Sequence, residues 1–144
     1  MGVMVRCRLM NAMLRFNGIH HVAIICSDYE RSKAFYMRVL GLRMVRETFR
    51  GERGSFKLDL EGGGMCVELF SFGPPSTVPP TRPTRPEACG LRHLAFGVND
   101  VDEAVRELMA QGVVCEPVRV DELTGKRFTF FADPDGLPLE VYEG

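Results

Sequence analysis

The sequence predicts an α+β fold in which two tandem βαβββ modules form a curved, half-open mixed sheet around a cleft. Two observations lead to this prediction. The chain has 144 residues, of which 45% are apolar and 26% charged, and this composition is typical of a soluble globular domain. The same order of strand-like and helix-like runs also occurs twice, so that His21 and Glu68 match His93 and Glu140 at an offset of 72 residues. Two copies with so long a period indicate a duplicated module and not a solenoid.

The first module is expected over residues 18–72. It begins with a short β-branched run that is typical of a strand, and Ser27-Asp28 then offers an N-cap for a helix that ends at Gly41. The Gly62–Gly64 run predicts a tight hairpin connection between the last two strands. The strands of this module are expected over Ile19–Cys26, Leu42–Phe49, Ser55–Leu60 and Met65–Phe72.

A connector over residues 73–89 separates the two modules and holds six of the nine prolines, which favour an extended, stiff segment. The second module, residues 90–144, repeats the order of the first. Asn99-Asp100 offers its helix N-cap, Gly112 ends that helix, and Asp133–Gly136 (D-P-D-G) predicts a turn. Its strands are expected over Leu91–Val98, Val113–Val120, Arg127–Ala132 and Leu137–Glu143.

Charge, hydropathy and cysteine content argue against several classes of protein. Lys plus Arg is 18 and Asp plus Glu is 19, so the net charge of −1 predicts no nucleic-acid partner. No apolar run approaches the roughly 18 residues of a membrane span, so no membrane partner is expected. The five cysteines are odd in number and lack a C-x-x-C pair, which argues against a disulfide framework and favours a cytoplasmic location. Residues 1–17 are interpreted as a poorly ordered N-terminal extension, with Met13 as an alternative start.

The repeat places two histidines and two glutamates at equivalent positions. His21 and Glu68 are 47 residues apart, and so are His93 and Glu140. Because side chains alternate along a strand, each histidine and each glutamate should face away from the apolar positions that pack under the helix. Two imidazoles and two carboxylates in one cleft suit zinc, nickel, cobalt, manganese or iron(II). The sequence therefore predicts one divalent metal ion, with zinc or nickel favoured, in a metal cleft formed by these four residues.

Two other residues could compete as ligands. His20 lies on the apolar face of its strand and its repeat mate is Arg92, so the repeat selects the neighbouring histidine. Cys66 lies on the ligand face, but its repeat mate is Pro138, which cannot bind a metal. A single strand histidine or glutamate is more often an ordinary hydrogen-bonded residue, and an edge strand often carries a charge. The metal prediction therefore depends on the joint spacing and parity of all four residues.

Four segments resemble the vicinal oxygen chelate superfamily, which is the glyoxalase/bleomycin resistance/dioxygenase group. The resemblance covers about residues 18–143, and the D-P-D-G-x-x-x-E ending is its most specific feature. It implies paired βαβββ modules around a divalent metal, a small-molecule substrate and a homodimer. By position, the four predicted ligands match those of glyoxalase I. The segments are IHHVAIICSDYERSKAFYMRVLGL, VELFSF, LRHLAFGVNDVDEAV and FFADPDGLPLEVYE.

The chain also departs from known members of this family. Glyoxalase I enzymes that use glutathione usually carry Arg where this chain has Ile25, and Asn where it has Phe72. Both departures argue against a glutathione adduct as the substrate. Methylmalonyl-CoA epimerases commonly have Gln in place of Glu68, whereas ring-cleaving dioxygenases and fosfomycin-type transferases use two His and one Glu. Bleomycin-binding members lack the metal set.

The leading hypothesis is a metal-dependent, glyoxalase-like lyase or isomerase that acts by proton transfer next to a metal-chelated carbonyl. Glu140 is the first choice for the group that takes and returns the proton, and Glu68 is the second. Arg127, Phe128 and Phe130 are candidates for the substrate side, although core packing is the favoured interpretation of the two phenylalanines. The alternatives are an iron(II) ring-cleaving dioxygenase and a non-catalytic small-molecule or antibiotic-binding protein. The sequence leaves open whether the modules pair within one chain or across a dimer.

Overall fold

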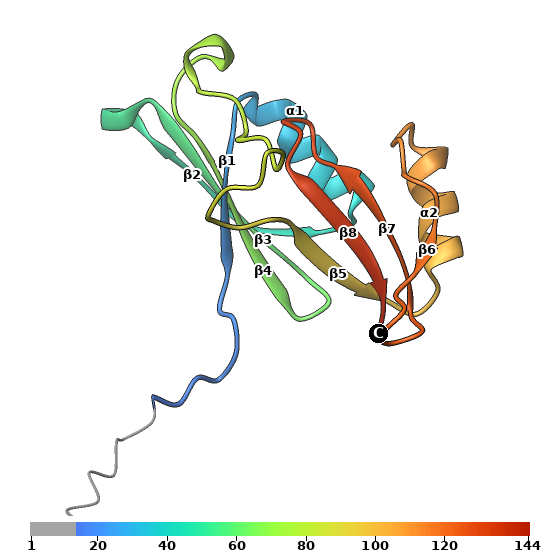
Figure 1. Ribbon diagram of the computed structural model, residues 1–144. Coiled ribbons are helices and arrows are strands. Elements are labelled where there is room, and N and C mark those ends of the chain that lie inside the picture. The colour runs from blue at the N-terminus through green and yellow to red at the C-terminus, as the bar shows by residue number, and fades with distance from the viewer. Residues whose placement is uncertain (1–13) are drawn as a thin grey trace, which may run out of the picture.

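The computed structural model describes residues 14–144, which form two four-stranded sheets, one from each half of the chain (Figure 1). This architecture confirms the predicted α+β fold with two modules. Most of the predicted N-terminal extension lies outside the described residues, as does the alternative start at Met13, and residues 14–17 carry no helix or strand.

In the first sheet the strand order is β1-β4-β3-β2, with β1 parallel to β4 and the other pairs antiparallel. The Asp28 side chain caps the helix that follows β1, because it accepts a hydrogen bond from the backbone N–H of Arg31. That helix continues as a π-helical segment up to Val39. The elements are β1 (Val22–Cys26), α1 (Tyr29–Ala34), the π-helical segment (Phe35–Val39), β2 (Arg43–Arg50), β3 (Ser55–Gly62) and β4 (Met65–Ser71).

The second sheet has the equivalent order β5-β8-β7-β6, again with one parallel pair, β5 with β8. Asp100 caps its helix as predicted, by accepting a hydrogen bond from the backbone N–H of Glu103. The elements are β5 (Leu94–Val98), α2 (Val101–Ala110), β6 (Arg119–Val120), β7 (Arg127–Ala132) and β8 (Pro138–Glu143).

Three predicted strands are clearly shorter in the structure. The strand expected to begin at Ile19 begins at Val22 instead, and Ile19 is 85% exposed. The strand expected over Val113–Val120 is reduced to the two residues of β6, because Pro117 has no N–H to donate to a ladder. The strand expected to begin at Leu91 begins at Leu94 instead, and Leu91 is 90% exposed. Without an apolar neighbour to cover it, this part of the segment gains nothing from joining the sheet.

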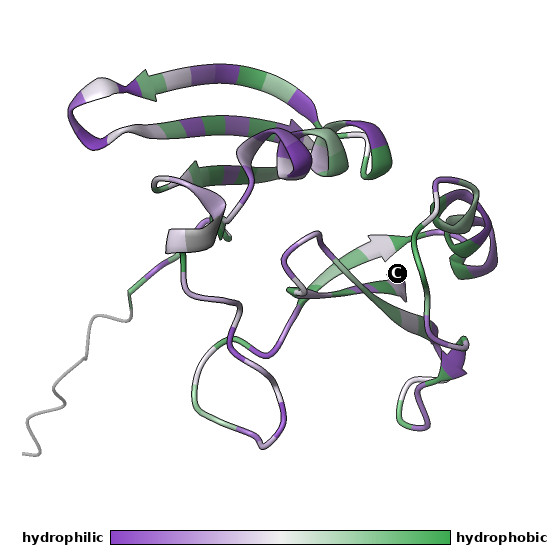
Figure 2. Ribbon diagram, turned by 90° about the horizontal axis from the view of Figure 1, so that it is seen from above, coloured by the Kyte–Doolittle hydropathy of each residue, from purple (hydrophilic) through white to green (hydrophobic). Residues whose placement is uncertain are grey.

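Burial alternates from residue to residue along β1 and β5, whereas in β8 Leu139, Glu140 and Val141 are all buried. In β1 the side chains of Ile24 and Cys26 are buried, whereas Ile25 between them is 59% exposed. The same alternation appears in β5, where Phe96 is buried between exposed neighbours. Figure 2 shows hydrophilic and hydrophobic residues alternating along the long strands of the first sheet. The predicted parity therefore holds along β1 and β5, and the pairing sets Glu68 and Glu140 opposite the exposed residues Ala23 and Ala95.

The D-P-D-G turn joins the two modules. Asp135 accepts a hydrogen bond from the backbone N–H of Ser27 at 3.0 Å and also contacts the Ser27 hydroxyl. Asp133 accepts a hydrogen bond from the buried hydroxyl of Tyr36 at 2.9 Å. Ser27 lies just before α1, and Tyr36 lies in the π-helical segment that follows it. Both contacts therefore come from the helical region of the first module, which lies beside the ends of β7 and β8 (Figure 1). The modules also meet through apolar residues. Leu42 of the first module and Phe131 of the second are among the residues that line a half-open cavity of about 290 Å³ between them.

No helix in the described part of the chain has the length and apolar character that a membrane crossing requires. The four cysteines that the structure describes are free thiols, and burial raises the pKa of the Cys26 thiol to about 11. A thiol with so high a pKa is protonated and unreactive at neutral pH.

Candidate metal centre

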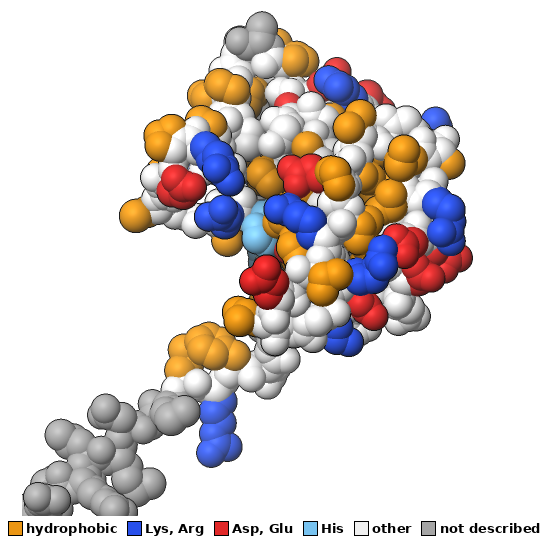
Figure 3. All heavy atoms as spheres, turned by 45° about the vertical axis from the view of Figure 1, so that its right-hand side comes forward, with side chains coloured by type: hydrophobic (Ala, Val, Ile, Leu, Met, Phe, Trp, Pro, Cys, Tyr) orange, Lys and Arg blue, Asp and Glu red, His pale blue; other side chains and the backbone are white. Residues whose placement is uncertain are grey.

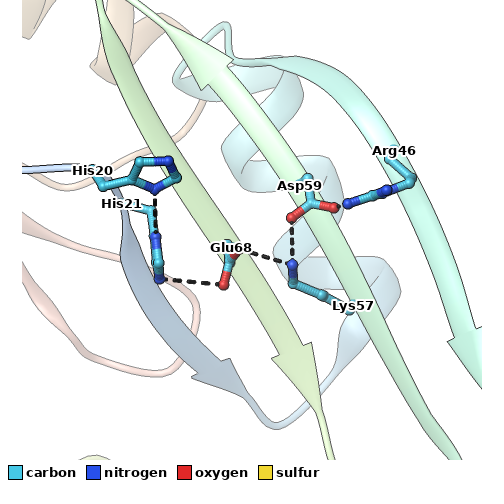
Figure 4. A network of polar contacts seen from close by, with 6 residues as sticks. All are labelled: His20, His21, Arg46, Lys57, Asp59 and Glu68. Atoms are coloured by element: carbon cyan, nitrogen blue, oxygen red, sulfur yellow. Dashed lines mark hydrogen bonds and ion pairs between the residues drawn. The ribbon is translucent and has the colours of Figure 1, made fainter.

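In the first candidate pair, His21 lies directly before β1, and Glu68 lies in the middle of the adjacent strand β4 (Figure 4). Parallel pairing of β1 with β4 sets Ala23 opposite Glu68, and His21 is on the same face as Ala23. As a result, His21 Nε2 lies 3.6 Å from Glu68 Oε2. The imidazole is 42% exposed and the carboxylate 20%, so both are open to a ligand from solvent.

A chain of charges continues from Glu68 across the sheet (Figure 4). The other carboxylate oxygen of Glu68 pairs with Lys57 Nζ at 2.8 Å, and Lys57 also pairs with Asp59 at 2.8 Å. Arg46 completes the row with a contact of 3.2 Å to Asp59. The hydrogen bond to Lys57 lowers the pKa of Asp59, and the hydrogen bond to Asp59 raises the pKa of Lys57. Glu68 therefore has a contact at each of its two carboxylate oxygens, with His21 at one and Lys57 at the other.

His20, which the sequence offered as a competing ligand, contacts the ring of His21. Its Nδ1 lies 2.9 Å from Nδ1 of His21 (Figure 4). A second hydrogen-bonding partner on the remote ring nitrogen is the usual support for a metal-binding histidine, because it orients the ring. This contact leaves Nε2 of His21 directed at Glu68.

The second candidate pair, His93 and Glu140, repeats the geometry in the other module. Nε2 of His93 lies 2.9 Å from Oε2 of Glu140, which sits opposite Ala95 in the parallel β5–β8 pair. Glu140 is buried, with 7% of its surface exposed. The ring of Phe130, the antiparallel neighbour of Glu140 on β7, meets the His93 ring edge to face at 5.0 Å. The two pairs are equivalent in topology and differ in burial.

The two pairs do not meet in one chain. Among residues 14–144, no three His, Cys, Asp or Glu side chains are close enough together to hold a metal ion. The donor types nevertheless suit a divalent ion, because each pair offers one imidazole nitrogen and one carboxylate. Each pair therefore supplies two of the four ligands in the predicted set.

The residues predicted for the substrate side divide between the two faces of the second sheet. Phe128 and Phe130 share the face of Glu140, and the rings of the two phenylalanines lie 6.0 Å apart. Arg127 lies next to them in sequence, so strand parity directs it to the other face, where it pairs with Asp102 of α2 at 2.7 Å.

Sequence reasoning missed several charged residues near the candidate pairs. Lys57 and Asp59 share a face with Glu68 through the antiparallel β3–β4 register, and this register could have identified them. Arg85, Arg92 and Arg119 line a cavity of about 730 Å³ together with His93. No local pattern indicates this second group, because its members come from the connector, from the segment before β5 and from β6.

Comparison with known proteins identifies the family of the chain and several relatives. The family model described as Glyoxalase/Bleomycin resistance protein/Dioxygenase superfamily matches residues 18–141. The uncharacterized protein YwkD of Bacillus subtilis is 63% identical over 126 residues, which cover 87% of this chain and 95% of that protein. The 2-epi-5-epi-valiolone epimerase of an Actinomyces species is 28% identical, over 85% of this chain and 77% of that protein.

Solved structures share the fold. The glyoxalase family protein from Enterococcus faecalis is 49% identical, with a TM-score of 0.80 over 89% of this chain and 98% of that one. Lactoylglutathione lyase from Agrobacterium tumefaciens is 26% identical, with a TM-score of 0.65 over 89% of this chain and 94% of that one. The fosfomycin resistance protein FosX from Listeria monocytogenes, solved with Mn(II) and a sulfate ion, is 18% identical, with a TM-score of 0.67 over 90% and 94%.

Proposed function

Because the chain belongs to the Glyoxalase/Bleomycin resistance protein/Dioxygenase superfamily, we propose that it is a metal-dependent, glyoxalase-like lyase or isomerase. The observation that carries the proposal is the repetition of one histidine–glutamate contact in both modules, at 3.6 Å and 2.9 Å. The similarity to a lactoylglutathione lyase and to an epimerase supports proton transfer next to a carbonyl as the reaction class. The Mn(II) in FosX supports a divalent ion as the cofactor.

The metal would be held by His21, Glu68, His93 and Glu140, with two pairs brought together from two copies of the chain. This arrangement follows from the separation of the pairs within residues 14–144, where each sheet presents only half of the set. A symmetric pair of chains would supply both halves twice and form two equivalent sites. The open sheet faces, with exposed side chains such as Ile25, offer the surface that a second copy would cover.

The proposed roles of the two glutamates follow from their environments. A bound divalent ion supplies positive charge that stabilises negative charge on a substrate oxygen. Glu140 takes a proton from the carbon next to the carbonyl and returns it to the neighbouring carbon. We assign this role to Glu140 because its only ion-pair partner among the described residues is the His93 imidazole. Glu68 is the second choice for this role, since Lys57 and His21 hold both of its oxygens.

One observation favours a second candidate function. Lys57 pairs with Glu68 at 2.8 Å and thus competes with a metal for that carboxylate. If the pair persists, the ligands reduce to two histidines and one glutamate, the set that suits iron(II) oxygenases. The second candidate is therefore an iron(II) ring-cleaving dioxygenase, for which oxygen uptake with a catechol is the distinguishing assay.

Elemental analysis of protein purified without chelators tests both candidates. The wild-type chain should carry about one equivalent of a divalent metal per chain, and the His93→Ala/Glu140→Ala variant should lose it. Glu107→Ala, an exposed glutamate on α2, is the matched control and should keep the metal. Zinc, nickel, cobalt or manganese supports the lyase or isomerase, and iron supports the dioxygenase. Absence of metal from the wild-type protein would overturn both.

A further inference from the structure

A cavity of about 730 Å³ opens against His93 and carries an excess of positive charge. Its lining includes Arg85 from the connector, Arg92 from the segment before β5 and Arg119 in β6. Glu116 is the one carboxylate that lines it. In the space-filling view, Lys and Arg side chains lie on both sides of a histidine in the hollow of the molecule (Figure 3). The lining of the cavity therefore includes three guanidinium groups and one carboxylate.

Aromatic rings hold Arg119 at this place. Its guanidinium carbon lies 5.1 Å from the ring centre of Phe128 and 5.6 Å from that of Phe130. Phe130 in turn contacts the His93 ring at 5.0 Å. Stacking on aromatic faces restrains the long side chain and leaves its N–H groups free to donate in the plane of the guanidinium. The positive charge of Arg119 is thus fixed one ring away from the candidate metal ligand.

The charge of the cavity is only partly neutralised within the described chain. Arg119 pairs with Glu116 at 3.0 Å, and both side chains are more than half exposed, so this pair is weak. For Arg85 and Arg92, no carboxylate of residues 14–144 lies within 4 Å of either guanidinium. Both groups are exposed and available to an anion from solvent.

We propose that this cavity binds an oxyanionic group of the substrate, a carboxylate, phosphate or phosphonate, through Arg85, Arg92 and Arg119. Guanidinium groups donate pairs of parallel hydrogen bonds that match the geometry of all three anions. An anion held here lies beside His93, so the uncharged, reacting end of the same molecule reaches the proposed metal site. That the bound anion is part of a substrate rests on the proposed function. That the cavity binds an anion at all is inferred independently, from the cavity and its arginines.

Calorimetric titration with three probes tests the site: methylphosphonate, inorganic phosphate and acetate. Dimethyl methylphosphonate, which is uncharged, is the control ligand. The variants are Arg85→Gln/Arg92→Gln and Arg119→Gln, and Arg106→Gln on α2 is the matched control because Arg106 does not line the cavity. Each protein is checked for folding by circular dichroism and for metal by elemental analysis.

We expect at least one anionic probe to bind the wild-type chain and the Arg106→Gln control equally, and to bind each cavity variant about tenfold or more weakly. The probe that binds best identifies the anion class. Equal affinity in all four proteins, or no binding of any anionic probe, would overturn the proposal.

The same titrations in the His93→Ala/Glu140→Ala background separate this proposal from the metal proposal. If the wild-type protein holds no metal but its anion binding still depends on the arginines, the metal function fails and the anion site stands. If metal is present and the arginines make no difference to binding, the anion site fails and the metal function stands.

Discussion

At the scale of single residues, the two candidate glutamates occupy equivalent positions in different surroundings. Glu140 is buried and contacts His93, whereas Glu68 is half-buried and contacts both His21 and Lys57. A carboxylate that must leave its ligand position and accept a proton needs freedom from other partners. The surroundings therefore favour Glu140 as the proton carrier and Glu68 as a fixed ligand.

Replacing Glu140 with Gln should separate metal binding from turnover. The amide oxygen can still coordinate, so part of the metal should remain, but an amide cannot accept the proton, and turnover should fall by at least about a hundredfold. Metal content and the rate with α-oxoaldehyde adducts are the two measurements. Glu107→Gln on α2 is the control. An unchanged rate in Glu140→Gln would remove this residue from the mechanism.

At the scale of secondary-structure elements, an aspartate caps both helices. Asp28 and Asp100 each accept a hydrogen bond from the backbone N–H three residues later, at 3.1 Å and 2.9 Å. Helix N-termini have four N–H groups without intrahelical partners, and a capping carboxylate satisfies one of them. Because the two aspartates occupy equivalent positions in the repeat, each helix begins at the same distance along the chain from the histidine of its module.

Asp100→Ala should lower the free energy of unfolding by about 1 kcal/mol, because the first turn of α2 loses its cap. Asp100→Asn, which preserves an acceptor, should lose much less. Urea unfolding followed by circular dichroism gives both values. Equal losses in the two variants would show that the cap hydrogen bond does not stabilise α2.

At the scale of the whole molecule, the D-P-D-G turn connects the two modules through buried polar contacts. Asp133 accepts hydrogen bonds from the Tyr36 hydroxyl and from the backbone N–H groups of Asp135 and Leu137. Burial raises the pKa of Asp133, although these hydrogen bonds oppose the shift. Tyr36 is fully buried, so its hydroxyl has to find a partner inside the protein.

The raised pKa of Asp133 predicts how stability depends on pH. Between the ordinary aspartate pKa of 3.8 and the higher pKa in the folded protein, the folded state binds more protons than the unfolded state. The stabilisation that protonated Asp133 provides is therefore present at low pH and is lost as the pH rises through the folded pKa. The free energy of unfolding of the wild type minus that of Asp133→Asn should fall with rising pH in this window.

Urea unfolding at a series of pH values measures this difference. Thr129→Val, a buried residue without a titratable side chain, is the control, and its difference from the wild type should not change with pH. A wild-type advantage over Asp133→Asn that grows with pH would contradict the raised pKa.

The pairing of two chains makes a prediction about mixtures of variants. A His21→Ala/Glu68→Ala chain and a His93→Ala/Glu140→Ala chain each lack one pair, and each alone should bind no metal. After the two are unfolded together and refolded, mixed dimers contain one intact site, with one pair from each chain. About a quarter of the wild-type metal content should return. No recovery in a mixture that forms dimers would show that the ligands pair within one chain.

The sequence alone determined the features that depend on local pattern. Strand parity and the 72-residue repeat predicted the faces of His21, Glu68, His93 and Glu140, since side-chain direction alternates along any strand whatever lies around it. Helix caps and glycine turns likewise follow from the backbone needs of a few neighbouring residues. The α+β class and the modular order were predictable for the same reason.

Only the tertiary structure decided which distant residues meet. Lys57 reaches Glu68 because of the register of β3 on β4, and Arg85 reaches the His93 cavity because the connector passes beside residues of β7 and β8. The separation of the two histidine–glutamate pairs within one chain was likewise invisible in the sequence. These contacts depend on how whole sheets pack and where a proline-rich loop runs, and neither leaves a periodic signal in the sequence.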